Sequence, residues 1–169
     1  VYDRIRFGEE TFNFVAGISA FKDNLKVSFP TAKDCKAIDT YVDTVRATAR
    51  EARRFFAEKT LPGIQAAVAG PFMRRGFLKY ASRSTLEVMS EITDNPKLIA
   101  VLTGQYGDYG LPPSKSSFAM HAMLVRHYFN GGAYPVGGSV RFFETMAPPI
   151  LEAGGCVMTN AEVERVVVK

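Results

Sequence analysis

The two histidines of the chain, His121 and His127, are the first candidates for acid–base or metal chemistry. Six residues apart, they fall on different faces of a helix, so the pair does not predict a two-histidine metal site. A hydrogen-bonded core position explains His121, and a place in a cavity lining is the alternative. No Ser-His-Asp set, paired-cysteine motif or phosphate loop accompanies them. The chain is therefore expected to contain no catalytic residue and no metal site of its own.

Aromatic and methionine side chains gather in the last third of the chain. Ordinary core packing explains such residues, and a tunnel for a long apolar polyene is the alternative, because flexible Met and flat rings suit a flexible, flat ligand. Both interpretations can hold for different members of the set. The set is Phe118, Met120, Met123, Tyr128, Phe129, Tyr134 and Phe142.

The segment Phe72-Met-Arg-Arg-Gly-Phe-Leu-Lys-Tyr80 mixes basic and aromatic residues. A solvated surface loop is the plain interpretation. A membrane-surface contact is the alternative, with apolar side chains dipping in while Arg and Lys meet the head groups. No recognition fold or stacking motif accompanies the charge, so nucleic acid is not an expected partner.

The composition is that of a soluble globular protein, with 169 residues, 47% hydrophobic and 22% charged. A net charge of +4 is far below that of a dedicated nucleic-acid binder. Cys35 and Cys156 lie far apart without a partner motif, which favours two reduced thiols over a disulfide. The most apolar run, Ile64 to Met73, is too short to span a bilayer.

The elements that must position these residues are mainly helical. Alternating side chains predict a β-hairpin over residues 1–16, and Pro30 ends a short helix at 18–28. Thr31 caps a long amphipathic helix that reaches about Lys59. Over 61–81 the sequence predicts one or two helical turns broken by Gly70-Pro71 and Gly76. Further helices are predicted over 84–94, 96–104, 114–130 and 139–153, the last kinked or split by Pro148-Pro149, and strands over 156–159 and 162–168.

These elements predict an α+β fold, with a mainly helical domain, a small antiparallel sheet at the start and a strand pair at the end. A hairpin at the C-terminus leaves unpaired backbone groups on an edge that a complete domain normally covers. The sequence is therefore expected to be cut from a larger protein.

Several segments, in this order and spacing, resemble the FAD-dependent phytoene dehydrogenase, carotenoid isomerase and retinol saturase group of the amine-oxidase-like flavoproteins. They are Tyr2-Asp-Arg-Ile-Arg-Phe7, Gly17-Ile-Ser-Ala-Phe-Lys, Phe29-Pro30, Asn95-Pro-Lys-Leu98, His121, Tyr134-Pro-Val-Gly-Gly138, Gly154-Gly155 and Asn160-Ala-Glu-Val163. The family's Gly-x-Gly-x-x-Gly fingerprint is missing, since Gly104, Gly107 and Gly110 have the wrong spacing and follow a helix. The resemblance thus implies the middle of such an enzyme. Residues 1–137 would form the substrate-binding (cap) domain, and 138–169 the return helix and strand pair leading into a truncated FAD-binding domain.

The resemblance also implies site residues. Val163 would contact the adenine end of FAD through its backbone, and Gly137 and Gly138 would let the backbone approach the flavin ring closely. The substrate would be contacted by His121, Phe118, Leu124, Tyr128 and Tyr134. Flavin chemistry needs few protein acids, because the cofactor itself takes or gives the hydride.

The expected function is that of a substrate-binding part of an FAD-dependent oxidoreductase that desaturates, saturates or isomerises carbon–carbon double bonds of an apolar polyene or isoprenoid. The isolated chain is expected to be inactive, without tightly bound FAD. A free-standing module that binds a hydrophobic ligand or partner is the alternative, and a flavin amine oxidase with a polar substrate is a third reading. Expected partners are an apolar small molecule, a membrane surface contacted peripherally and a second copy of the chain, in a cytoplasmic or membrane-peripheral location.

Overall fold

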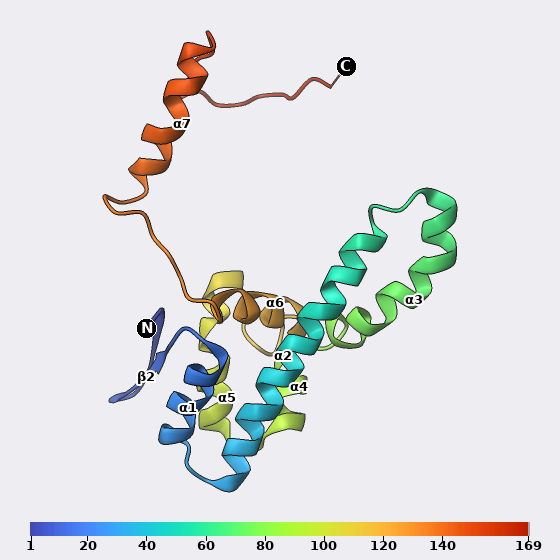
Figure 1. Cartoon of the computed structure of the whole chain (residues 1–169), viewed down its shortest axis with the longest axis vertical. Coiled ribbons are helices and arrows are strands. Elements are labelled where there is room, and N and C mark those ends of the chain that lie inside the picture. Colours follow the sequence, from blue (N-terminus) through green and yellow to red (C-terminus); the bar gives the residue numbers. More distant parts are fainter. Residues whose placement is uncertain (169) are drawn as a thin grey trace. The chain divides into compact units, whose positions relative to one another are not determined.

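The computed structural model describes residues 1–168, and the chain divides into two compact units, Val1–Gly132 and Ala133–Lys169. Unit 1 contains every strand and all helices but one, and unit 2 contains the remaining helix, α7 (Figure 1). The elements of unit 1 are β1 Asp3–Phe7, β2 Glu10–Phe14, α1 Ile18–Ser28, α2 Ala32–Glu58, α3 Gly63–Ala81, α4 Thr85–Ile92, α5 Pro96–Leu102, the 3₁₀ helix η1 Gly104–Tyr109 and α6 Phe118–Tyr128. The predicted assignment of 138–169 to an FAD-binding domain stays a prediction.

The predicted N-terminal hairpin is confirmed. Strands β1 and β2 pair antiparallel, with Asp3 opposite Phe14 and Phe7 opposite Glu10. Gly8 makes the tight turn at a φ of 61°, a backbone region that glycine enters without steric cost. Phe12 and Phe14 are buried, so one face of this two-stranded sheet is held against the helices.

The predicted long helix is also confirmed as α2. The Thr31 hydroxyl accepts a hydrogen bond from the Asp34 amide at 3.1 Å and so caps its first turn. Ile38, Val42 and Val45 follow at spacings of three and four and are almost fully buried. An apolar stripe with this period must face a core, and α2 contacts both α3 and α6.

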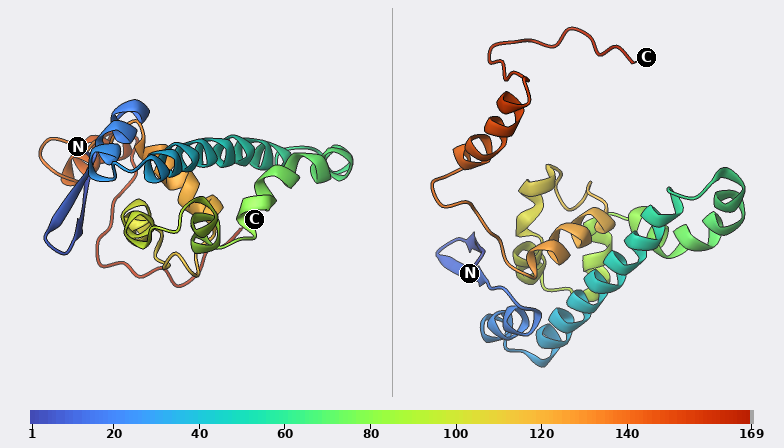
Figure 2. Two further views of the ribbon diagram at one scale, coloured as in Figure 1. Left: turned by 90° about the horizontal axis from the view of Figure 1, so that it is seen from below. Right: turned by 45° about the horizontal axis from the view of Figure 1, so that its top comes forward.

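The prediction of broken turns over 61–81 is wrong, because α3 is one helix with Pro71 inside it. Gly70 and Gly76 do not break α3, and their missing side chains leave room for neighbouring side chains. A Cβ on Gly70 would lie 2.8 Å from the Glu58 carboxylate, and one on Gly76 would collide with Glu51. Glu51 and Glu58 belong to α2, so the two glycines let α3 approach α2 closely (Figure 2). The basic-aromatic segment 72–80 therefore lies on a helix and not in a loop.

The predicted starts of α4 and α5 are confirmed. The Glu87 amide donates to the Ser84 hydroxyl at 3.2 Å, and the Ser84 amide donates to the Glu87 carboxylate at 2.7 Å, which completes a capping box. The Asn95 side chain accepts from the Lys97 and Leu98 amides, with Pro96 in the first turn.

The next two segments differ from the prediction. Residues 104–109, expected as helix end and loop, form η1. Helix α6 begins at Phe118, four residues later than predicted, because Ser117 caps it.

The main core of unit 1 lies where the hairpin, α1, α2, α4, α5 and α6 meet. Its largest fully buried side chains include Tyr41, Phe14, Phe21, Phe118, Phe129 and His121. A smaller cluster of Ala52, Phe77 and Ala119 joins α2, α3 and α6. The described helices include none that is both long enough and apolar enough to cross a bilayer.

Unit 2 has little core of its own. Helix α7 spans Val140–Glu152 as one helix with Pro148 and Pro149 inside it, so of the two predicted effects, a kink or a split, the split does not occur. Ala147 is its one buried side chain among the described residues. The predicted strands at 156–159 and 162–168 are not formed, because residues 155–168 have no ladder pairing and the chain bends at 159–160. A lone two-stranded ribbon is marginal in water, and unit 2 offers neither a third strand nor a core to support it.

Candidate functional site

His121 is a fully buried polar residue of the unit 1 core, and it lies between two tyrosines. Its Nε2 lies 2.9 Å from the Tyr41 hydroxyl, and its Nδ1 lies 3.2 Å from the Tyr109 hydroxyl. The Tyr41 hydroxyl also lies 3.3 Å from the Leu102 carbonyl. These three side chains come from α6, α2 and η1, so the network ties three elements together inside the core.

One arrangement of protons satisfies the whole network. A carbonyl only accepts, so Tyr41 donates to Leu102. Tyr41 then accepts from the Nε2–H of His121, and Nδ1 accepts from Tyr109. Burial lowers the pKa of His121 to about 4 and raises the pKa of both tyrosines, which keeps all three groups neutral near pH 7.

The predicted substrate residues on α6 take different positions. His121 and Phe118 are fully buried with ring centroids 5.8 Å apart. Leu124 is half-buried, and Tyr128 stacks on Tyr2 with ring centroids 5.6 Å apart. The core interpretation of His121 thus accounts for its contacts, and its role toward a substrate stays a prediction.

The predicted residues of unit 2 lie in exposed chain. Tyr134 and Val163 are 73% and 76% exposed. Gly137 and Gly138 have φ of 93° and 87°, and a Cβ on Gly138 would meet no atom within 4 Å. A Cβ on Gly137 would lie 2.6 Å from the Arg141 guanidinium, so only Gly138 leaves the backbone open to close approach, and the predicted FAD contact of both glycines stays a prediction. No interaction in the structure links Val163 to this loop.

Among the hollows of unit 1, two have a largely apolar lining that a ligand could contact. One, of about 660 Å³, lies between α2 and α6 and is lined by Ala49, Ala52, Arg53, Phe56, Met123, Arg126, His127 and Asn130. The other, of about 320 Å³, has a mostly apolar lining of Leu86, Pro96, Ile99, Ala100, Thr103, Pro113 and Ser114. His121, Phe118, Leu124 and Tyr128 line neither hollow.

Sequence reasoning missed both partners of His121. Tyr41 falls between Ile38 and Val45 at the three- and four-residue spacing of the α2 stripe, so the period could have placed it in the core. Tyr109 lies in a glycine-rich stretch that has no period, and no signal in the sequence pairs it with His121. The α2–α6 groove depends on helix contact across more than 60 residues of chain, which one sequence does not reveal.

The chain is similar to a segment of curated proteins named all-trans-retinol 13,14-reductase. It is 36% identical over 162 residues to the one from Danio rerio, covering 92% of this chain and 26% of that protein. The one from Homo sapiens is 34% identical over 163 residues, with 94% and 26% covered. A Danio rerio protein named inactive all-trans-retinol 13,14-reductase is 30% identical over 159 residues.

The chain thus spans about a quarter of the length of these relatives. No protein-family model matches the chain, and no solved structure matches it. These relatives support the retinol saturase part of the resemblance, and the phytoene dehydrogenase and carotenoid isomerase parts stay untested. Because a relative named inactive also matches, this segment alone does not separate active from inactive proteins.

Proposed function

We propose that this chain is the substrate domain of a longer FAD-dependent oxidoreductase that acts on a carbon–carbon double bond of a retinoid or similar polyene. The observation that carries the proposal is the similarity to all-trans-retinol 13,14-reductases over nine-tenths of the chain or more. Unit 1 would shape the substrate side, and unit 2 would lead back to the cofactor.

The residues present fit a supporting role in such chemistry. A flavin, when bound, supplies the hydride acceptor or donor, so the protein's task is to position the substrate and exclude water. The helices of unit 1 carry apolar and aromatic side chains with no charged catalytic set, which suits an uncharged polyene. Gly138, with open space above its Cα, is the position in unit 2 that fits a flavin ring.

The test is an assay of the longer protein that contains this segment. Purified with FAD and given all-trans-retinol and a reductant, it should yield a product two mass units heavier that has lost one conjugated double bond. The 169-residue chain, assayed alongside, should be inactive and carry no stoichiometric flavin. A longer protein that binds no flavin would contradict the proposal and favour the hydrophobic-ligand module. One that oxidises amines would favour the amine oxidase.

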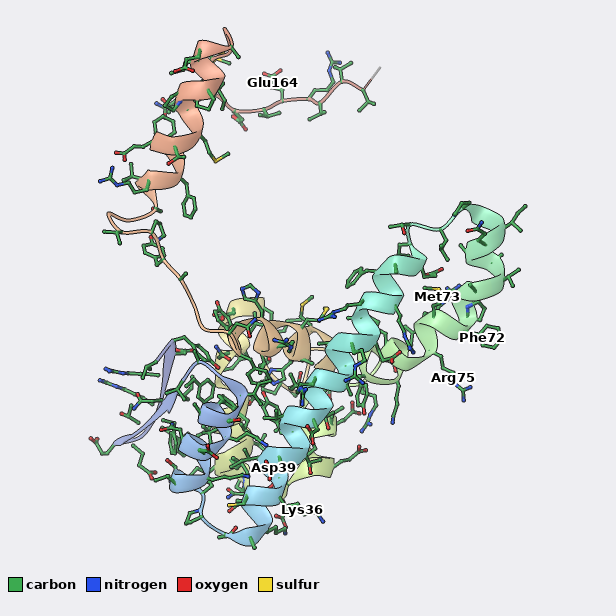
Figure 3. All side chains as sticks on the ribbon, viewed as in Figure 1. Lys36, Asp39, Phe72, Met73, Arg75 and Glu164 are labelled. Carbon is green, nitrogen blue, oxygen red and sulfur yellow. The ribbon has the colours of Figure 1, made fainter. Side chains whose placement is uncertain are left out.

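We also propose that α3 brings the enzyme to a membrane surface, where a lipid-soluble substrate would be found. Ile64, Val68 and Phe72 lie on one face of α3 and are 84%, 70% and 83% exposed. Arg75 and Lys79 continue the same face toward the end of the helix. Figure 3 shows Phe72 and Arg75 on the side of α3 away from α2, and Met73 on the side toward it. An apolar patch followed by basic residues matches the interior and the head groups of a bilayer.

A further inference from the structure

One face of α2, together with α6, gathers four arginines. Arg46, Arg50 and Arg53 fall at spacings of four and three residues, so they share a face of α2. With Ala49 and with Arg126 of α6 they line a hollow of about 200 Å³. Ala49 has a small side chain, which leaves room between the guanidinium groups.

Among the described residues, few carboxylates lie close enough to pair with these arginines. The Arg46 guanidinium lies 3.8 Å from Asp43, in an exposed pair of little weight. Arg50, Arg53 and Arg126 have no carboxylate within 4 Å in the described part of the chain. The acidic residues of the same half of α2, Glu51 and Glu58, lie instead against the glycines of α3. Like charges gathered in this way repel one another and favour a bound anion.

The hollow lies next to the larger one between α2 and α6, because Ala49, Arg53 and Arg126 line both. The larger hollow adds apolar surface from Ala52, Phe56 and Met123. The Phe56 side chain is 53% exposed although it is a large aromatic group. The two hollows, here called the arginine groove, therefore combine a basic end with an apolar end.

We propose that the arginine groove binds a phosphate group, with an apolar chain of the same ligand lying against Phe56 and Met123. A phosphate monoester carries close to two negative charges and three strong acceptor oxygens, and guanidinium forks match this geometry with paired hydrogen bonds. A carboxylate, with one charge and two oxygens, would leave most of the cluster unmatched. This proposal stands apart from the oxidoreductase proposal, since the binding needs neither flavin nor activity.

Calorimetric titration of the 169-residue chain tests the site with three probes. They are inorganic phosphate, dihexanoyl phosphatidic acid below its micelle concentration and dihexanoyl phosphatidylcholine. The phosphatidic acid should bind at least about tenfold more tightly than either of the others, because it alone offers both a free phosphate and an apolar chain. Its affinity should fall with added salt.

Two double variants of equal net charge separate the site from general electrostatics. Arg53→Gln/Arg126→Gln removes the two arginines shared by both hollows and should weaken phosphatidic acid and inorganic phosphate at least about tenfold. Arg6→Gln/Arg54→Gln removes two exposed arginines outside the groove and should change both affinities less than about twofold. Thermal unfolding without ligand checks that both variants fold.

A third variant, Phe56→Ser, distinguishes a phosphate that carries an apolar chain from a soluble phosphate ester. It should weaken phosphatidic acid and leave inorganic phosphate unchanged. If phosphatidic acid and inorganic phosphate bind equally well and Phe56→Ser affects neither, the apolar part of the proposal is overturned and the site takes soluble phosphate esters. If the wild type binds neither probe, or the two double variants lose the same affinity, the whole proposal is overturned.

Discussion

His121 is the residue whose environment the structure defines most completely. It is fully buried, and both ring nitrogens face tyrosine hydroxyls. The sequence predicted a hydrogen-bonded core histidine from an apolar helix, and the contacts agree. Its partners were not predictable in the same way, since Tyr41 and Tyr109 lie 80 and 12 residues away along the chain.

The lowered pKa of His121 predicts a pH dependence of stability. The unfolded chain takes up a proton at this residue near its ordinary pKa of 6.5, but the folded chain does so only near a pKa of about 4. Between these values the unfolded state holds more protons, so the free energy of unfolding falls as the pH is lowered. At about 1.4 kcal/mol for each pKa unit, the loss by pH 4 should be about 3 kcal/mol.

Urea unfolding at several pH values between 7 and 4 measures this loss. His121→Gln should lower stability at pH 7 by about 1–3 kcal/mol, because the tyrosine network is disturbed, and should flatten the slope over this range. His127→Gln, which changes the one other histidine, should keep the wild-type slope. Equal slopes in wild type and His121→Gln would show that His121 does not stay neutral in the fold.

At the scale of elements, the caps were predictable and the close contacts were not. Two helix starts could be predicted from local capping residues, and the structure confirms both. They are Ser84 with Glu87, and Asn95 with Pro96. The sequence predicts helix breaks at Gly70-Pro71 and Gly76, because glycine is a poor helix former on its own. The space that a Cβ would need is taken at Gly76 by the Glu51 carboxylate of α2, and at Gly70 by the Glu58 carboxylate of α2 together with the Arg74 guanidinium of α3. A local pattern does not contain that information.

Gly70→Ala is therefore expected to destabilise the chain although alanine is the better helix former. The new methyl group would lie 2.6 Å from the Arg74 guanidinium and 2.8 Å from the carboxylate of the buried Glu58, so it would disturb this ion pair, whose charged atoms are 3.7 Å apart. Disturbing this buried carboxylate should outweigh a helix-propensity gain of about 1 kcal/mol and leave a net loss of about 1–2 kcal/mol. Gly63→Ala on the same helix meets no atom within 4 Å and should change stability by less than about 0.5 kcal/mol. Denaturant midpoints decide this, and equal effects of the two changes would refute the close-packing role.

The exposed face of α3 predicts binding to anionic vesicles. Each large apolar side chain that leaves water can contribute about 1.5–3 kcal/mol, and each basic residue near an anionic surface about 1 kcal/mol. In flotation assays Ile64→Ser/Phe72→Ser should reduce vesicle binding at least about tenfold. A separate variant, Arg75→Glu, should bind vesicles in a way that no longer depends on the charge of the lipid. Val27→Ser/Leu111→Ser removes two exposed apolar side chains, one from α1 and one from the loop between η1 and α6, and serves as the control. If Ile64→Ser/Phe72→Ser and the control variant bind vesicles equally well, the exposed face of α3 is not the membrane contact.

At the scale of the whole molecule, the two units differ in how far they are self-sufficient. Unit 1 has a continuous core, and its hairpin and most of its helices followed from the period of the sequence. Unit 2 has one buried side chain in its helix, and its apolar residues Phe142, Phe143, Met146 and Leu151 are more than half exposed. The strands predicted at 156–159 and 162–168 are not formed, because pairing needs a neighbour that unit 2 does not supply. Tyr134, Gly137, Gly138 and Val163 accordingly have no defined site in this chain alone.

Hydrogen exchange of the longer protein, with and without FAD, tests most directly whether unit 2 leads to the cofactor. Loading FAD should slow exchange of the amides at 134–138 and 156–168, since the loop would cover the flavin and the extended segment would pair with a neighbouring strand. The core amides of α2 and α6 should exchange slowly in both states. If 134–138 and 156–168 exchange at the same rates with and without bound FAD, this chain does not form the return into a flavin-binding domain.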